Sequence, residues 1–320
     1  MSMNINSQPL PTNSDLVSVV IPMFNSAKWI RQTLISVFEQ DYSFLEVLIV
    51  NDGSTDTSLR EVEQVASEYP GVDLRIISIP NSGVSFARNI GIGHSNGKYV
   101  ALLDSDDIWH HTKLALQVEF LQKNQNCIAV LCDFFISLSE ENGMALRNVR
   151  LISNKDNKSL GQNWLNLEGN GALLSSTALL NRTRFVDVAS FDSELSTTAD
   201  LHFYFQLISK GEVGLVNLPL VQYRQHGNQM HSNPDNLRKE IPLLLSKLES
   251  LNVPYEKNRV MANMSVMCSI LNLHHRQYLA STVDFFNALR LRPLSTVQIP
   301  YRIIRKRFFG YIELKCLGNG

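Results

Sequence analysis

Four short apolar runs alternate with amphipathic segments between residue 17 and about residue 131. The runs are residues 17–21, 46–50, 74–79 and 99–103. Each is almost continuously apolar, which is typical of strands that are buried on both faces of a sheet. The gaps carry apolar stripes at helical spacing. The stripes are Ile30, Leu34 and Val37 or Phe38, and then Leu59, Val62, Ala66 and Tyr69. This alternation predicts a parallel sheet covered by helices.

The pattern changes twice further along the chain. It is less regular from about residue 160 to residue 231, where we expect a helix over residues 200–210 and a loop over residues 223–226. From Pro234 onward it is helical. The helical stripes are Leu244, Leu248 and Leu251, and then Leu279, Val283 and Phe286. We expect a loose tail over residues 1–15, an α/β domain over residues 16–232 and a helical region over residues 233–320.

Composition narrows the class of protein. The 29 Lys and Arg balance 30 Asp and Glu, so the chain lacks the basic excess of a duplex-binding protein. Its four cysteines have no ligand spacing, which favours buried thiols in a reducing compartment over a zinc site. Neither a signal peptide nor an apolar run of about 18 residues is present. We therefore expect a cytoplasmic protein, soluble or peripheral to a membrane.

Carboxylates follow two of the predicted strands. Asp52 ends the second strand, and Asp104, Asp106 and Asp107 follow the fourth. Ligands of open α/β sheets bind beyond the carboxyl ends of the strands. Three adjacent carboxylates repel one another unless water or a cation separates them, so a hard divalent metal ion is a natural partner. Acidic loops also serve as turn formers or helix caps, and the cluster alone leaves both interpretations open.

Four sequence blocks occur in a fixed order. They are Val17-Ser-Val-Val-Ile-Pro-Met-Phe-Asn25, Val47-Leu-Ile-Val-Asn-Asp-Gly-Ser-Thr-Asp56, Asn81-Ser-Gly-Val-Ser-Phe-Ala-Arg-Asn-Ile-Gly91 and Leu102-Leu-Asp-Ser-Asp-Asp107. Together they resemble the successive motifs of the family 2 glycosyltransferases, over roughly residues 17–231. The resemblance implies the GT-A fold, a Rossmann-like, mixed, mainly parallel sheet flanked by helices that binds a nucleotide sugar. Residues 16–131 would then be the donor-binding half and residues 132–232 the acceptor half.

The resemblance assigns roles to the acidic cluster. Asp104-Ser105-Asp106 is similar to the D-x-D element of the family. Asp106 is then the best ligand for Mn²⁺ or Mg²⁺, and Asp104 lies nearer the ribose or the metal. Asp107 is a supporting or sugar-facing carboxylate. A metal in this place neutralises charge on the departing diphosphate.

Other donor-site roles follow from the first three blocks. The family's equivalent of Asp52 accepts hydrogen bonds from the base or ribose, although an Asx turn is an alternative. Pro22, Phe24 and Asn25 form the first loop, where the proline and the phenylalanine are expected to flank the base. Arg88 is expected to face the donor phosphates, with an ordinary surface ion pair as the alternative.

Two late motifs complete the implied site. Asp200 is similar to the catalytic base of inverting enzymes, with favourable charge in a first helical turn as the alternative and Asp192 as a weaker substitute. The family's usual preceding Glu is replaced by Ala199. His226 resembles a late histidine that approaches the metal or the diphosphate, assisted by Arg224. Trp109 and Trp164 are candidates for stacking on sugars, with core packing as the alternative.

The implied activity is inverting, metal-dependent glycosyl transfer of hexosyl or N-acetylhexosaminyl type. The expected donor is a UDP-sugar, and the expected acceptor is a hydroxyl of a glycan or lipid-linked saccharide in cell-surface polysaccharide synthesis. The alternatives are a catalytically impaired nucleotide-sugar-binding module, suggested by Ala199, and a sugar nucleotidyltransferase. The latter is disfavoured because the chain lacks a glycine-rich phosphate loop near its first strand.

The C-terminal segment is basic. Residues 285–312 hold six basic side chains and no acidic one. On a helix, Tyr301, Ile304, Phe308 and Tyr311 would share one face. Two interpretations stay open: the segment packs on the catalytic domain, or it lies on an anionic membrane surface at the inner face of the cytoplasmic membrane.

Overall fold

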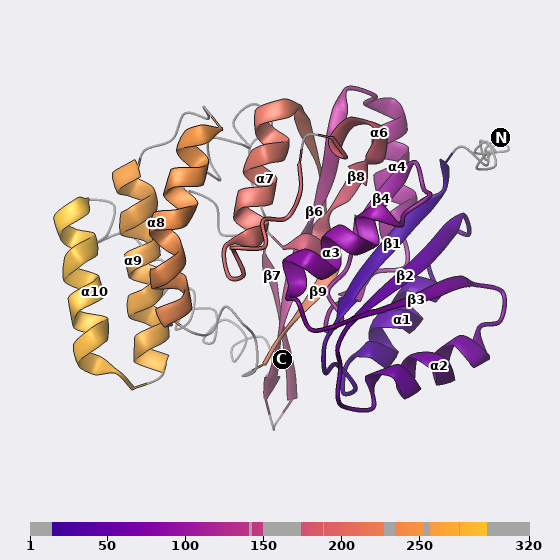
Figure 1. The fold of residues 1–320 in the computed structure, drawn as a ribbon, viewed down its shortest axis with the longest axis horizontal. Coiled ribbons are helices and arrows are strands. Elements are labelled where there is room, and N and C mark those ends of the chain that lie inside the picture. Colours follow the sequence, from indigo (N-terminus) through magenta and orange to yellow (C-terminus); the bar gives the residue numbers. More distant parts are fainter. Residues whose placement is uncertain are drawn as a thin grey trace, which may run out of the picture. The chain divides into compact units, whose positions relative to one another are not determined.

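The computed structural model describes two compact units of the chain. The described residues are 15–140, 143–149, 174–187, 189–226, 234–251, 257–274 and 276–292. The first unit holds a mixed sheet with its helices and ends at His226, whereas the second holds three helices that begin at Pro234 (Figure 1). Among the helices of these ranges, none combines the length and apolar character needed to cross a bilayer.

The four predicted strands are present. They are β1 (Val17–Met23), β2 (Leu45–Asp52), β3 (Asp73–Ile79) and β4 (Tyr99–Leu102). β1 lies between β2 and β4, β3 lies outside β2, and all three pairs are parallel. β1, β2 and β4 are buried almost throughout. The expected burial of both faces is wrong for β3, whose side chains are exposed or half-buried because it is the edge strand.

The helices between these strands cover both faces of the sheet. They are α1 (Ile30–Phe38), α2 (Ser58–Glu68) and α3 (Val84–Gly93). The strand order runs outward from β1 to β3 and returns to β4, so right-handed crossovers put α1 and α2 on one face and α3 on the other. α1 buries the predicted Ile30, Leu34 and Val37. α2 buries Val62 of the expected stripe, but its other buried residues are Ser58 and Val65, and Leu59, Ala66 and Tyr69 are only half-buried.

α3 lies unusually close to the sheet at Gly91. A Cβ atom added at this glycine would lie 2.3 Å from Cγ1 of Val20 and 3.2 Å from Cγ2 of Val50, so no larger residue fits without a shift of β1 or β2. Arg88 is three residues earlier and therefore shares the buried face of the helix. The close approach thus places the side chain of Arg88 next to the sheet.

The remaining elements of the first unit extend the same sheet. They are β5 (Ile108–Trp109), α4 (Lys113–Lys123), β6 (Cys127–Glu140), β7 (Gly143–Val149), a 3₁₀ turn (Ser175–Thr177), β8 (Leu179–Asn181), α6 (Arg182–Phe185), α7 (Ala199–Lys210) and β9 (Glu212–Gln225). The described strands form one sheet in the order β3-β2-β1-β4-β8-β6-β9-β5, with β7 paired to β6. The sheet is mixed, as predicted, and four of its eight pairs are antiparallel.

Two predictions for this segment have different outcomes. The expected helix over residues 200–210 is confirmed as α7. The expected loop over residues 223–226 is wrong for its first three residues, because β9 continues alongside β6 to the pair Leu138–Gln225. Only His226 lies beyond the strand. Cys127, Cys132 and Cys268 are free and buried, as expected.

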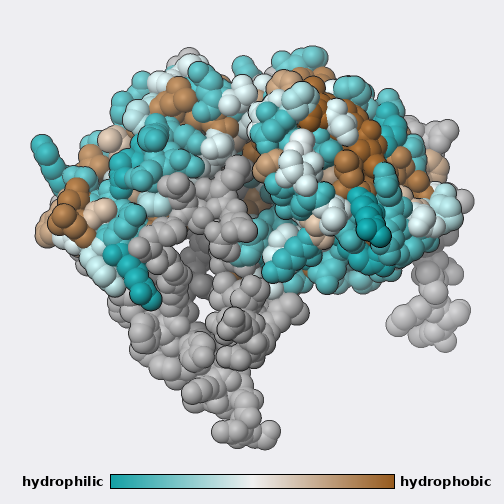
Figure 2. Space-filling model, turned by 60° about the horizontal axis from the view of Figure 1, so that its bottom comes forward, coloured by the Kyte–Doolittle hydropathy of each residue, from teal (hydrophilic) through white to brown (hydrophobic). Residues whose placement is uncertain are grey.

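The second unit consists of α8 (Pro234–Ser250), α9 (Lys257–His274) and α10 (Tyr278–Leu291). α8 buries the predicted Leu244 and Leu248. The stripe predicted for α10 is exposed instead, and hydrophobic atoms of this helix reach the surface at the left edge of Figure 2. The cause is a buried ion pair. Because Asp284 pairs with Arg238 at 2.8 Å, the face of α10 that carries small and polar residues turns inward.

Several predictions fall on residues outside the described ranges. These are the tail up to residue 14, Trp164 and the helical face of Tyr301, Ile304, Phe308 and Tyr311.

Candidate active site

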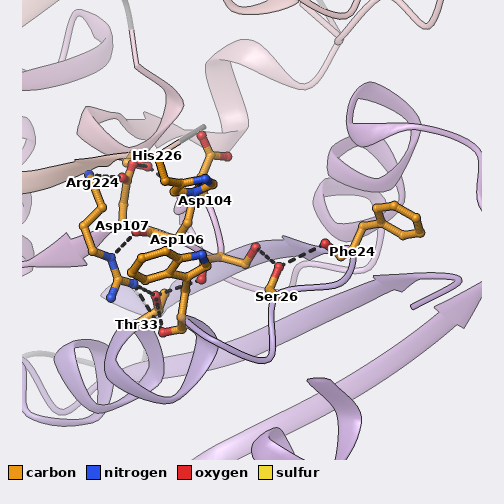
Figure 3. A network of polar contacts seen from close by, with 11 residues as sticks. Phe24, Ser26, Thr33, Asp104, Asp106, Asp107, Arg224 and His226 are labelled. Carbon is orange, nitrogen blue, oxygen red and sulfur yellow. Dashed lines mark hydrogen bonds and ion pairs between the residues drawn. The ribbon is translucent and has the colours of Figure 1, made fainter. Parts of the chain in front are cut away.

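The first two loops at the carboxyl edge of the sheet are tied together by Asn25. Its backbone is left-handed, with a φ of 48°, which asparagine tolerates better than most residues. Its side-chain oxygen accepts hydrogen bonds from the N–H groups of Thr55 at 2.8 Å and Asp56 at 3.3 Å. Pro22 is buried within β1, whereas Phe24 is 48% exposed and lies to one side of the acidic residues in Figure 3. Of the two residues expected to flank the base, the structure therefore presents only Phe24.

Asp52 fixes the start of α3. Its carboxylate accepts the N–H groups of Ser82 at 2.7 Å and Gly83 at 2.9 Å. The Asx turn considered for this residue is not formed, because both carboxylate oxygens bind Ser82 and Gly83, and the N–H of Ser54 donates to the side chain of Asn51 at 3.0 Å instead. The contact of Asp52 with a nucleoside stays a prediction, which the second lone pair of each oxygen allows.

Arg88 joins two acids from distant parts of the chain. Its guanidinium donates to Oδ1 of Asp104 at 2.6 Å and to Oδ1 of Asp200 at 2.7 Å, and it lies 4.9 Å from the ring centre of Phe191. Its side chain is only 5% exposed, so the alternative of an ordinary surface ion pair is wrong. Burial would lower the pKa of Arg88, but the two carboxylates raise it above its ordinary value, and the group stays charged.

Asp104 is held in an electrostatically unfavourable place. Burial and the negative charges of Asp200 and Asp106 outweigh the attraction of Arg88 and raise the pKa of Asp104 to about 6. Its backbone N–H donates to the hydroxyl of Ser176 at 3.1 Å. A site in which negative charges crowd around a carboxylate favours the approach of a further cation.

Asp107 is an internal residue. Its side chain is fully buried and accepts the hydroxyl of Ser176 at 2.5 Å and the backbone N–H of Arg224 at 3.2 Å. Burial and the charges of Asp106 and Asp104 raise the pKa of Asp107 well above its ordinary value. Two roles were expected for this residue, support of the turn and contact with a sugar. The buried position is consistent with support of the turn and not with contact with a sugar.

Asp106 and His226 face each other beside this buried acid (Figure 3). Oδ2 of Asp106 lies 2.9 Å from Nε2 of His226, and the two side chains are 22% and 17% exposed. Carboxylate oxygen and imidazole nitrogen are suitable ligands for Mn²⁺, and the carboxylate also suits Mg²⁺. The sequence motif therefore predicted two side chains that the structure brings together.

Ser105 and Arg224 hold the acidic turn against α1. The hydroxyl of Ser105 is 2.6 Å from that of Ser26, and its carbonyl accepts the hydroxyl of Thr33 at 3.0 Å. Arg224 donates to the side chains of Gln32 at 2.7 Å and Thr33 at 2.8 Å, and also to the carbonyl of Asp106. Arg224 is thus an anchor of the turn.

Asp200 lies in the first turn of α7. Its Oδ1 binds Arg88, and its Oδ2 accepts the N–H of Ser175 at 3.2 Å. The side chain is 22% exposed and can meet a ligand. Ala199 is fully buried, so a glutamate on the same backbone would place a charge in the core. The weaker candidate, Asp192, caps a local turn by accepting the N–H of Glu194 at 3.0 Å.

Sequence reasoning missed the contacts that Ser175, Ser176 and Thr33 make with the acids and the turn. These small polar residues carry no motif, and their partners are far away in the chain. Trp109 is a core residue, because its ring is 3% exposed and its N–H donates to the carbonyl of Ser176 at 2.9 Å. This burial excludes the stacking on a sugar that was considered for Trp109.

The acids fit a cation that is held only partly by the protein. In the part of the chain that the structure describes, no group of three or more His, Cys, Asp or Glu is placed to hold a metal ion. Asp104 is engaged by Arg88, which leaves Asp106 and His226 as the pair facing each other. Two protein ligands leave coordination positions for diphosphate oxygens and water, as is usual for Mg²⁺ sites that bind phosphates.

The sequence model of Glycosyl transferase family 2 matches residues 18–182. An uncharacterized glycosyltransferase of Rickettsia felis is 30% identical over 239 residues, which are 75% of this chain and 39% of that protein. The putative teichuronic acid biosynthesis glycosyltransferase TuaG of Bacillus subtilis is 28% identical over 77% of this chain and 96% of its own length. The chain thus spans about two fifths of some of its relatives.

Two solved structures show the same fold. Residues 1–349 of Staphylococcus aureus TarS, in complex with UDP-GlcNAc, match with a TM-score of 0.60 at 20% identity, over 82% of this chain and 73% of that one. The mannosyltransferase PcManGT of Pyrobaculum calidifontis, in complex with GDP-Man and Mn²⁺, matches with a TM-score of 0.56 at 18% identity, over 94% and 83%. The predicted GT-A fold is confirmed.

Proposed function

We propose, because this chain belongs to glycosyl transferase family 2, that it moves one sugar from a nucleotide-sugar donor to a hydroxyl group with inversion at the anomeric carbon. The observation that carries the proposal is the bridge formed by Arg88. It joins Asp104, in the D-x-D turn, to Asp200, the predicted base. Residues with donor-side and acceptor-side roles therefore lie within one cluster of contacts.

Asp200 would accept the proton of the acceptor hydroxyl as that oxygen attacks the anomeric carbon. The bond to the diphosphate oxygen breaks at the same time, and its electron pair leaves with the diphosphate. Arg88 and the N–H of Ser175 hold the carboxylate, so it is oriented before the acceptor arrives. The partly exposed side chain leaves room for that approach.

Asp106 and His226 would hold a divalent cation, Mn²⁺ or Mg²⁺, which when bound neutralises the charge that develops on the diphosphate. Asp104 would lie next to the same group or to the ribose. Asp52 and Phe24 would contact the nucleoside from the first two loops, where Asn25 ties the backbone together. Asp107 would act from beneath as a buried support for the turn.

The names of similar proteins support a more specific role. TarS was solved with UDP-GlcNAc, and TuaG is named for teichuronic acid synthesis. We therefore favour a UDP-sugar as donor and a glycan or lipid-linked saccharide of a cell-surface polysaccharide as acceptor. Residues 16–232 would form the catalytic domain, and the basic segment over residues 285–312 would provide any peripheral membrane contact.

The test is turnover of a panel of nucleotide sugars by the full chain, with Mn²⁺, Mg²⁺ or EDTA. We expect metal-dependent release of a nucleoside diphosphate from one donor and its loss in Asp106→Asn. Asp41→Asn is the matched control, because this exposed aspartate pairs with the exposed His111 and not with a residue of the acidic turn. Turnover that survives both EDTA and Asp106→Asn would reject the metal assignment, and donor binding without any turnover would favour the binding-module alternative.

A further inference from the structure

The ring of Trp29 lies against the ring of His226. The two ring centres are 5.0 Å apart, and the planes differ by 15°, which is a stacked arrangement. Trp29 precedes the first residue of α1, and its side chain is half-buried. The contact joins residues that are almost 200 positions apart, and neither the four blocks nor the late motifs point to it.

The other contacts of Trp29 fix its position. The guanidinium of Arg224 lies 5.0 Å from the ring centre and donates to the carbonyl of Trp29 at 3.2 Å. Arg224 is itself held by Gln32 and Thr33, one turn further along α1. The indole ring is therefore attached to a buried network and can serve as a rigid wall. The exposed Lys28 also contacts this ring, with its nitrogen 4.4 Å from the ring centre.

This wall sets the plane of the imidazole ring. A histidine side chain rotates about two torsions, and the second is broad in energy. Stacking on a fixed aromatic ring restricts that rotation while leaving the edge of the imidazole available. In the structure the edge that carries Nε2 points at Oδ2 of Asp106, 2.9 Å away. The neighbours of a metal-ligating histidine commonly fix its orientation in this way and affect metal affinity as a result.

We propose that Trp29 is a positioning residue, which holds the imidazole of His226 so that Nε2 and the carboxylate of Asp106 share one divalent cation. The inference rests on the proposed function, because it needs His226 to be a metal ligand. It adds a role for a residue outside the acidic turn and connects α1 to the metal site. The competing explanation is that Trp29 only fills space beside the last strand.

The test measures Mn²⁺ affinity in the presence of UDP, from the electron paramagnetic resonance signal of the free ion. Trp29→Leu removes the planar ring, and we expect it to weaken Mn²⁺ binding by about tenfold, as is typical for residues that orient a ligand. Trp29→Phe keeps a stackable ring and should restore most of the affinity. Lys28→Ala is the matched control, since it removes a different contact of the same ring and should leave the affinity unchanged.

His226→Ala separates the two levels of the proposal. If it weakens Mn²⁺ binding and Trp29→Leu adds no further loss in the double variant, the indole acts through the imidazole. If His226→Ala weakens binding but Trp29→Leu does not, the inference is overturned and the metal assignment stands. If His226→Ala has no effect, the metal assignment fails and the inference with it. Trp29→Met replaces the leucine variant if that protein does not fold, and wild-type affinity in it is equally contrary.

Discussion

Two acidic sites lie at opposite edges of the parallel part of the sheet, one at the start of β2 and the other after the end of β4. Glu46 stands at the start of β2, where it accepts the hydroxyl of Ser18 at 2.5 Å and the N–H of Asn96 at 2.7 Å and pairs with Arg75. Burial alone would raise the pKa of Glu46, but these hydrogen bonds and the charge of Arg75 lower it below its ordinary value. The folded protein therefore favours the ionised form of this carboxylate more strongly than water does.

The acids at the end of β4 have the opposite balance. Burial and neighbouring carboxylates raise the pKa of Asp104 to about 6 and that of Asp107 well above its ordinary value. Asp104 and Asp107 both accept hydrogen bonds, as Glu46 does, but each is also repelled by the negative charges of neighbouring carboxylates. A buried carboxylate whose hydrogen bonds and ion pair are all supplied by the protein, such as Glu46, stabilises the fold. A group of carboxylates that repel one another, such as the acids after β4, still attracts a further cation besides Arg88.

The largest effect is expected from a substitution among the acids at the carboxyl edge of the sheet. Asp200→Asn should lower kcat by about 10²–10⁴-fold, because the amide cannot accept the acceptor's proton. Donor affinity should be retained, as measured by calorimetry with a UDP-sugar and Mn²⁺. Asp192→Asn is the control and should keep its turnover. The reverse pattern would transfer the role of base to Asp192.

Removal of the guanidinium of Arg88, which pairs with both Asp104 and Asp200, has the next largest expected effect. Arg88→Met leaves Asp104 and Asp200 without their common partner in a mostly buried place, and we expect it to lower the free energy of unfolding by about 3 kcal/mol. The measurement is urea denaturation at pH 7.5. Arg31→Met is the control, because Arg31 forms an exposed pair with Glu68 that should contribute almost nothing. Equal stability of the two variants would refute a structural role for the bridge.

At the start of β2, Glu46→Gln should cost about 2–3 kcal/mol of stability at pH 7, since the amide leaves buried donors unpaired. The pKa of Glu46 is lowered on folding, so its contribution is present above the ordinary value for glutamate and is lost as the pH falls through the lower folded value. The deficit of the variant should therefore shrink below about pH 4. A deficit that is independent of pH would contradict this account.

The smallest expected effect has the opposite sign. The pKa of Asp104 is raised on folding, so between about pH 4 and pH 6 the native protein holds a proton that the unfolded chain has released. Wild-type stability should fall relative to Asp104→Asn as the pH rises through this window, by up to about 2 kcal/mol. The measurement is chemical denaturation in EDTA over pH 4–7. A relative gain for the wild type with rising pH would remove the contrast with Glu46.

The sequence predicts the strands of the first half well, because continuous apolar runs leave few alternatives. It does not predict that β3 is an edge strand, since strand order depends on pairings between segments and not on local pattern. The exposed stripe of α10 has a similar cause. Leu279, Val283 and Phe286 have the spacing of a core face, but the buried pair of Asp284 with Arg238 decides which face turns inward.

The site shows the same division. Asp104, Asp106 and Asp200 are identifiable from local motifs, because their chemistry depends on residue type and position in a block. The common partner of Asp104 and Asp200 is not identifiable in this way, since Arg88 and Asp200 are 112 residues apart and the motif is equally consistent with a phosphate-binding arginine. Likewise, the carboxylate of Asp52 accepts hydrogen bonds from the N–H groups of Ser82 and Gly83, and no local sequence pattern indicates these bonds.

The bridge at Arg88 has a consequence for the end of the catalytic cycle. One positive charge is divided between a carboxylate on the donor side and the predicted base. With Asp200 as the base, uptake of the acceptor's proton would remove one of those two negative charges and leave the attraction of Arg88 to Asp104 alone. The cluster would then be more positive by one charge, and its attraction for the anionic diphosphate would become stronger. Release of that proton from Asp200 would thus help the spent diphosphate to leave and free the site for the next donor.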